Sequence, residues 1–308
     1  MGDLKVVQFM HSGVEIPGVG TMVPWNASRH HYRRLIHHKG EYVDKSNRII
    51  KGDLAFWNEY EAPTNANPVT IGNRGWNYAK RVHEIARPIQ GLKNVLLKDP
   101  ECCANTDPCV FGKTFKYSNC QQVPGGDLWN LPAGSLVIFG SWHDNSFYLD
   151  TVFVTADDGV SFTVPVASQL PFKASSEFRK VTLDNLVPRP RKRGKTIDEF
   201  KLYRGKGPVV CSDWKVENEH PYSFTPARIF SSSTFNERCK LDLAYINQQM
   251  KKKVIGGEFS LTLKQHHKAV MSNASPADVL FIWKLIRDAV RNGKNGRSKF
   301  ELGVHFDW

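Results

Sequence analysis

Apolar and polar residues alternate strictly over residues 300–306, and this period of two predicts a β-strand with one buried face. The segment before it has a helical period. Its apolar residues recur on one helix face: Val279, Leu280, Trp283, Ile286 and Val290. Ser275 is a suitable N-cap and Pro276 suits the first helical position. With Gly293 as the terminator, the sequence predicts a helix over residues 276–292.

Two apolar segments in the middle of the chain, residues 136–140 and 147–154, are rich in β-branched and aromatic residues and flank a short polar turn. This arrangement predicts a hairpin. Neither segment alternates cleanly, so both faces of the hairpin are expected to be covered. A second hairpin is predicted around a Lys-Ser-Asn turn at residues 45–47, and a further strand over residues 52–61.

The N-terminal region combines a strand and a helix in this interpretation. Residues 4–9 predict a strand, and residues 28–40 predict a short basic helix that begins at Ser28 and ends at Gly40. Residues 62–110 are irregular and rich in Asn and Pro, as functional loops often are. Together the patterns predict an α+β protein with a mostly antiparallel β-core, for which a barrel is one arrangement, and a few packed helices.

The sharpest change in composition is the basic, proline-containing segment at residues 188–197. We expect a hinge or solvated loop there, with a phosphate-contacting arm as the alternative. The segment divides the chain into a β-rich lobe over residues 1–187, which carries the predicted site, and an α+β lobe over residues 198–308 packed on it.

Charge gives the first indication of a partner. The chain has 42 Lys and Arg against 30 Asp and Glu, a formal net charge of +12. Such a field attracts polyanions, so nucleic acid or a nucleotide is the expected partner, and a basic surface without such a partner is the competing explanation. No run of about 18 apolar residues and no secretory signal is present, which predicts a cytoplasmic protein without membrane contact.

Side chains able to do chemistry gather at residues 105–122. A polar run between apolar segments must face solvent or line a pocket, because unsatisfied buried polar groups are destabilising. The ligand-binding candidates are Asn105, Tyr117, Asn119 and Gln121, and the catalytic candidates are Asp107 and Cys120. A nucleophilic Cys120 would need a neighbour that lowers its pKa, and a small buried apolar residue is its alternative role.

Glu59 and Glu61 lie on one face of the predicted strand. Two such carboxylates bind a metal or act as acid and base, and an exposed strand edge with ordinary charges is the alternative. Arg29, Arg33 and Arg34 are expected to hold phosphate. The six cysteines have no paired zinc-type spacing, so we predict free thiols and no metal site. The sequence indicates no particular cofactor and no oligomeric state.

Residues 202–205, Leu-Tyr-Arg-Gly, are similar to the strand motif with which ADP-ribosyltransferases hold their dinucleotide. In that motif the arginine contacts phosphate, which implies the same role for Arg204. The catalytic glutamate motif of that fold does not follow in this chain.

Four stretches resemble an uncharacterised prokaryotic family with no known activity: residues 56–63, 105–112, 117–122, and 134–140 with 149–154. The resemblance covers about the first half of the chain. It departs at Asn58 and Tyr60, where that pattern has Gly and Trp. The central strand pair also resembles the entry of PUA-like barrels of the ASCH and EVE kind, which bind RNA or modified bases. This implies recognition of modified or foreign nucleic acid, as in prokaryotic defence.

The leading hypothesis is therefore a protein that binds nucleic acid or a nucleotide in a polar pocket beside the central hairpin. The alternative is an enzyme acting on the same ligands, of the hydrolase or glycosidase/transferase type. It would use Glu59, Glu61, Asp107 or Cys120 as acid, base or nucleophile.

Overall fold

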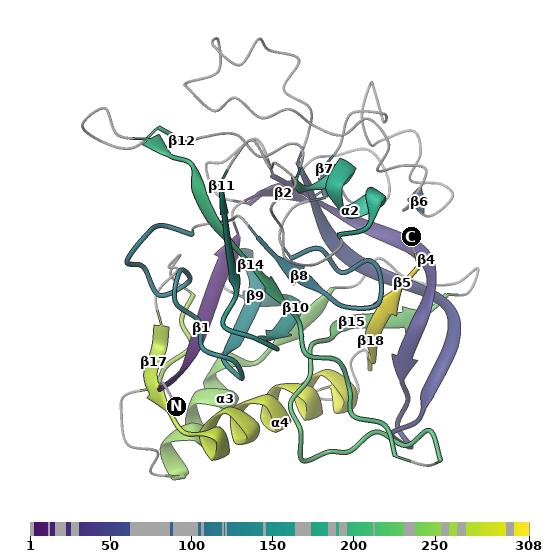
Figure 1. Ribbon diagram of the computed structural model, residues 1–308. Helices are drawn as coiled ribbons and strands as arrows, with labels where there is room; N and C mark the ends of the chain where they lie inside the picture. Colours follow the sequence, from purple (N-terminus) through teal and green to yellow (C-terminus); the bar gives the residue numbers. More distant parts are fainter. Residues whose placement is uncertain are drawn as a thin grey trace.

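Two large β-sheets form most of the structure (Figure 1). The computed structural model describes residues 3–11, 13–15, 23–25, 31–61, 87–88, 104–105, 108–118, 120, 122–143, 146–163, 174–183, 189–190, 196–211, 213–230, 238–253, 259–263, 269–293 and 299–307.

The first sheet has five strands in the order β16-β10-β9-β1-β17. Its strands are β1 (Leu4–His11), β9 (Leu136–His143), β10 (Ser146–Val154), β16 (Cys239–Leu241) and β17 (Ala269–Ala274). β1 pairs with β9 in parallel, and the remaining pairs are antiparallel. The β9–β10 pair is the hairpin that the sequence predicted.

The second sheet has eight strands in the order β3-β2-β4-β18-β15-β5-β7, and β6 also pairs with β4. Their bounds are β2 (Gly13–Glu15), β3 (Val23–Trp25), β4 (His31–Val43), β5 (Ile49–Glu61), β6 (Arg87–Pro88), β7 (Ala104–Asn105), β15 (Thr225–Ile229) and β18 (Glu301–Phe306). Because β4 and β5 also pair with each other, strands β4, β18, β15 and β5 close into a four-stranded antiparallel barrel.

Shorter elements surround these sheets. The small strands are β8 (Lys116–Tyr117), β11 (Val160–Thr163), β12 (Arg189–Pro190), β13 (Thr196–Ile197) and β14 (Glu199–Arg204). The helices are α2 (Ser176–Val181), α3 (Leu243–Lys252) and α4 (Pro276–Asn292). Among the described residues, no helix combines the length and the apolar character needed to span a bilayer.

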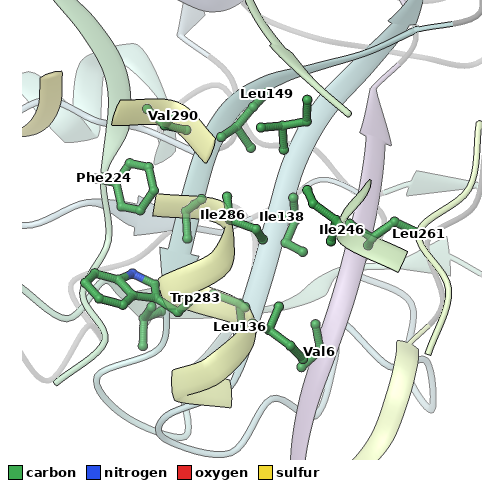
Figure 2. Packing of buried hydrophobic residues seen from close by; sticks show 14 of the residues in the cluster. Val6, Leu136, Ile138, Leu149, Phe224, Ile246, Leu261, Trp283, Ile286 and Val290 are labelled. Carbon is green, nitrogen blue, oxygen red and sulfur yellow. The ribbon is translucent and has the colours of Figure 1, made fainter. Parts of the chain in front are cut away.

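The five-stranded sheet is buried on both faces, as the uneven hydrophobic pattern of its hairpin predicted. Successive residues of β9 enter different clusters, because side chains alternate along a strand. Leu136 and Ile138 pack with α3 and α4, and Val137 and Phe139 pack in a second cluster with aromatic residues of the barrel. Figure 2 shows the first cluster, in which Trp283 of α4 lies against the sheet.

Helix α4 confirms the prediction for residues 276–292. Ser275 and Asp278 form a capping box, in which the Ser275 hydroxyl accepts from the Asp278 amide at 3.2 Å and the Asp278 carboxylate accepts from the Ser275 amide at 3.0 Å. The helix buries the side chain of Trp283, whose Nε1 donates to the Tyr222 carbonyl at 2.8 Å. The strand predicted at residues 300–306 is β18.

The helix predicted over residues 28–40 is wrong within the residues described, because residues 31–43 form strand β4. Thirteen residue pairs join β4 to β5, and this pairing determines the backbone conformation of a segment that has no regular helical stripe. Gly40 therefore does not end a helix. A Cβ atom there would lie 2.2 Å from the His305 carbonyl oxygen, so glycine permits the close approach of β18 that closes the barrel.

The α+β class and the barrel-like core are confirmed. Both large sheets contain strands from before and after residues 188–197. β16 and β17 join the sheet of β1 and β9, and β15 and β18 join the sheet of β4 and β5. Strand pairing thus crosses the predicted boundary between the lobes.

Candidate functional site

Strand register brings five predicted site residues to one end of the β4–β5 ribbon. Arg33 lies directly opposite Glu59, and Arg34 lies opposite Asn58. β7 pairs with the other edge of β5 and places Asn105 opposite Tyr60, one position before Glu61. The arginines, the glutamates and the asparagine are far apart in sequence, and three adjacent strands collect them.

This end of the ribbon extends past the barrel. β18 pairs with β4 at residues 40–43, and β15 pairs with β5 at residues 54–56, so residues 31–35 and 57–61 lie beyond both pairings. Opposite charges at facing positions stabilise a ladder by about 0.2–1 kcal/mol per pair. Arg33 opposite Glu59 is such a position in the register, and His31 lies opposite Glu61. In contrast, Arg34 faces the neutral Asn58.

A buried ion pair lies beside this end of β5. Arg238, which precedes β16, donates from Nη2 to the carboxylate of Asp150 in β10. The same nitrogen donates to Ser141 Oγ at 2.7 Å. The guanidinium also lies 5.6 Å from the ring centre of Trp57 and 5.2 Å from that of Tyr148. The cluster therefore joins the five-stranded sheet to β5, two residues before Glu59.

Arg238 and Asp150 were not among the candidate site residues. The only local signal is a carboxylate inside an apolar strand, which requires a partner when it is buried. The β9–β10 register shifts between Leu149 and Thr151, so Asp150 occupies an irregular position in the ladder. Cys239, which directly follows Arg238, is buried, and burial raises the pKa of its thiol to about 12.

Tyr117 and Cys120 lie in the second core cluster. The Tyr117 hydroxyl donates to the Cys120 carbonyl, and its ring stacks on Tyr203 at 6.0 Å between centroids. Cys120 is only 7% exposed. Arg204 is half exposed, and its Nε donates to the Asp157 carboxylate at 2.6 Å. The functional roles assigned to these three residues stay predictions.

Asp107, Asn119, Gln121 and Arg29 lie outside the described residues. The structure therefore places five of the predicted residues together, three elsewhere, and leaves these four without a described position.

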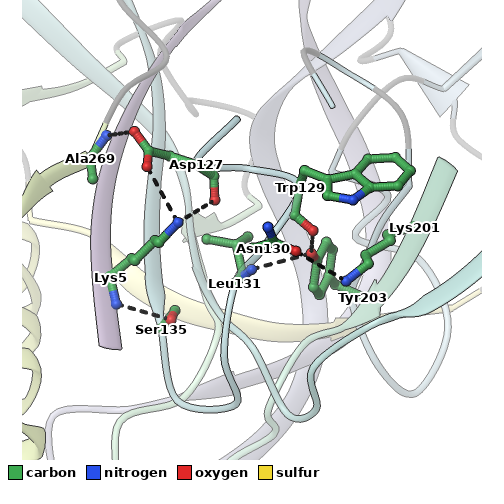
Figure 3. A network of polar contacts seen from close by, with 9 residues as sticks. All are labelled: Lys5, Asp127, Trp129, Asn130, Leu131, Ser135, Lys201, Tyr203 and Ala269. Atoms are coloured by element: carbon green, nitrogen blue, oxygen red, sulfur yellow. Dashed lines mark hydrogen bonds and ion pairs between the residues drawn. The ribbon is translucent and has the colours of Figure 1, made fainter. Parts of the chain in front are cut away.

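A polar network fixes the segment that leads into β9 (Figure 3). The Asp127 carboxylate pairs with Lys5 Nζ at 3.3 Å and accepts from the Ala269 amide at 2.8 Å. Tyr203 donates to the Trp129 carbonyl at 2.5 Å. Burial raises the pKa of Tyr203 to about 12, so its hydroxyl remains a donor at neutral pH. These contacts hold the segment against β1, β17 and β14, which is a structural role.

Within the described part of the chain, no group of three or more His, Cys, Asp or Glu side chains is arranged to hold a metal ion. No family model, no curated protein and no solved structure matches this sequence.

Proposed function

We propose that the protein binds nucleic acid or a nucleotide at the end of the β4–β5 ribbon beyond the barrel, where Arg34 contacts phosphate on one face of the ribbon and Arg33, the preceding strand position, does so on the other. Six of the nine residues 31–39 are basic, so one strand carries a dense row of cationic and titratable side chains. The carrying observation is the register of the ribbon: on β5 the residue opposite Arg34 is the neutral Asn58, whereas the residue opposite Arg33 is Glu59.

The neighbouring positions supply groups that recognise bases. Tyr32 faces Tyr60 across the ribbon, and Asn105 lies opposite Tyr60 on β7. Aromatic rings stack on bases and amides hydrogen-bond to base edges, while arginines contact phosphate. A site with all three groups suits a nucleotide or a single strand better than it suits a simple anion.

The test replaces Arg29, Arg33 and Arg34 together by Gln and measures binding of a labelled single-stranded oligonucleotide by fluorescence anisotropy over a range of salt concentrations. Each lost phosphate contact lowers the steepness of log K against log salt by about 0.7, so we expect a decrease of about 1.4 from Arg33 and Arg34 and of about 2 with Arg29 as a third contact. The melting temperature should change little.

The matched control replaces three other exposed cations, Lys240, Lys251 and Lys252, by Gln. We expect this variant to keep most of the affinity and most of the salt dependence. Equal losses in the two triple variants would mean that only overall charge matters, and unaltered binding in the first variant would remove this end of the ribbon from the proposal.

An enzyme acting on the same ligands is the second candidate, favoured by one feature of the register. Glu61 lies directly opposite His31, and a carboxylate beside an imidazole is a common acid–base combination. Under this alternative, Glu61→Gln should abolish product formation from a bound oligonucleotide and leave its affinity nearly unchanged. If the wild-type protein releases no product, the protein is a binder.

A further inference from the structure

A short hairpin at residues 209–217 carries an exposed tryptophan at its tip. Val210 and Val216 form an antiparallel bridge, and the Cys211 amide donates to the Lys215 carbonyl at 2.8 Å. The chain thus reverses direction between Cys211 and Lys215. Trp214 directly precedes Lys215, with φ of 59° and 71% of its surface exposed.

Tryptophan is an unfavourable residue at this position. Glycine is the preferred residue where a turn requires a left-handed backbone, because it has no Cβ. Asn47 and Trp214 are the two non-glycine residues with positive φ in the described part of the chain. Asparagine tolerates that conformation, whereas a bulky side chain is strained by it. Since the indole is mostly exposed, burial does not compensate for the strain.

A second unfavourable feature lies beside it. Arg48, at the β4–β5 turn, forms an antiparallel bridge with Lys215, so two cations face each other. Like charges at directly opposite positions destabilise a ladder. Asp44 partly offsets Arg48, with its carboxylate 3.8 Å from Arg48 Nε. Lys215 is exposed, as is Asp213 at the tip.

Glu217 and Glu219, two further carboxylates of this region, have partners of their own. Glu217 accepts from the Cys211 thiol at 3.3 Å and pairs with His220 at 3.0 Å. Glu219 pairs with Lys284 at 2.6 Å. Trp214 thus directly precedes Lys215 in the chain, Lys215 lies opposite Arg48, and Glu217 and Glu219 are engaged with other partners.

Hydrogen bonds to the β4–β5 turn hold the backbone on both sides of Lys215 in place. The Ile49 amide donates to the Trp214 carbonyl at 3.2 Å, and the Val216 amide donates to the Asn47 carbonyl at 2.6 Å. Arg291, at the end of α4, donates to Asn47 Oδ1 at 2.7 Å. Figure 1 shows the green segment that precedes β15 running beside the β4–β5 turn near the end of α4. Such preorganisation reduces the entropy lost when a ligand binds.

We propose that Trp214, Arg48 and Lys215 form a stacking platform for one base of a single-stranded nucleic acid. The base stacks on the indole, and the adjoining phosphate lies between the two cations. A planar ring joined to an anion relieves the charge repulsion and uses the exposed aromatic surface, whereas an apolar protein surface would bury the two cations unpaired. The inference rests on the proposed function for its class of ligand. The platform is a second site, separate from the one at Arg33: β4 extends about 33 Å from Arg33 to the β4–β5 turn.

The test compares two probes, a ten-nucleotide oligo-dT and an abasic oligomer of the same length and charge, whose binding is measured by anisotropy. Trp214→Gly should weaken oligo-dT binding about tenfold, the loss expected for one stacked base, and leave binding of the abasic oligomer unchanged. Its melting temperature should stay equal or rise, because glycine relieves the left-handed strain. Trp214→Phe should keep most of the affinity for oligo-dT.

Two further variants sharpen the assignment. Replacing Arg48 and Lys215 together by Gln should weaken the binding of both probes, since it removes phosphate contacts. Tyr245→Ala is the matched control, because it removes another exposed aromatic ring, on α3, and should change neither affinity. Wild-type affinity for oligo-dT in Trp214→Gly would overturn the platform alone and leave the hairpin as a protein contact. Failure of the wild-type protein to bind either probe would overturn the proposed function together with it.

Discussion

Arg238 donates a hydrogen bond to Asp150 where the two side chains are only 2% and 6% exposed. A buried ion pair of this kind is not itself a large source of stability, because both charges are desolvated. Removing one partner is strongly destabilising, since the other charge then stays buried without its ion-pair partner. The folded protein therefore requires β10 and the residue before β16 to stay packed together.

The first prediction follows from this pair. Asp150→Ala should lower the free energy of unfolding by about 3–5 kcal/mol, measured by urea denaturation. Replacing both partners by apolar residues, Asp150→Leu with Arg238→Met, should cost much less. Asp157→Ala is the matched control, because it breaks the half-exposed pair with Arg204 and should cost at most about 1 kcal/mol. Equal losses in the two single variants would contradict the structural role of the buried pair.

The second prediction concerns pH. Glu301 Oε2 is buried without a hydrogen-bond partner in the described residues, and burial raises the pKa of this carboxyl above its usual value of 4.5. A raised folded-state pKa favours the protonated form in the folded protein. This contribution to stability is fully present below about pH 4.5 and is lost as pH rises through the folded-state value.

Glu301→Gln should therefore be more stable than the wild-type protein at pH 7, and the difference should shrink toward pH 4.5. Urea denaturation at a series of pH values measures it. Glu199→Gln, at an exposed position of β14, is the control and should leave the pH dependence unchanged. A constant difference between Glu301→Gln and the wild type across the series would refute the assignment.

The third prediction concerns the thiols. The described cysteines, Cys109, Cys120, Cys211 and Cys239, are free, in line with the expectation from the sequence for these four. Cys211 is exposed, whereas burial raises the pKa of Cys239 to about 12. With Ellman's reagent, the native protein should therefore show Cys211 reacting before the other three, and Cys211→Ser should remove that phase.

The fourth prediction concerns how fast Cys211 reacts. The thiol donates to the Glu217 carboxylate, and this hydrogen bond raises the pKa of Cys211. Because the thiolate is the reactive form, Glu217→Gln should speed the reaction at pH 8. Glu219→Gln, two residues away on a different ion pair, should have little effect. A slower reaction in Glu217→Gln would show that the hydrogen bond does not govern this thiol.

The sequence predicted those elements whose signals are local. Ser275 and Gly293 bound helix α4, and the apolar segments of β9 and β10 have a pattern that needs no distant partner to be recognised. The strand β4 was missed because its backbone is set by pairing with β5 and β18, and a basic segment with an N-cap residue resembles a helix start. Gly40 shows the same problem, since a glycine that ends a helix and one that admits a neighbouring strand are identical in sequence.

The residues of the candidate site could be chosen from the sequence, but their proximity could not. Glu59, Arg33 and Asn105 were chosen by residue type, and only strand register shows that they share one end of a sheet. Arg238 lies 88 residues from Asp150, and no spacing rule connects them. Trp214 gave no signal, because its left-handed backbone and its exposure are properties of the folded chain.

The barrel cannot close until its last strand, β18, has been synthesised. β4 and β5 are neighbours in the chain, but β18 separates β4 from β15 in the barrel and comes from residues 301–306. A ribosome adding 5–20 residues per second needs on the order of tens of seconds to pass from residue 61 to residue 301. During translation the nascent β4–β5 hairpin therefore presents unpaired strand edges, which are templates for aggregation. Lys39 and Glu41 lie along the edge of β4 that β18 later covers, and charged residues at an open edge discourage pairing with a second copy.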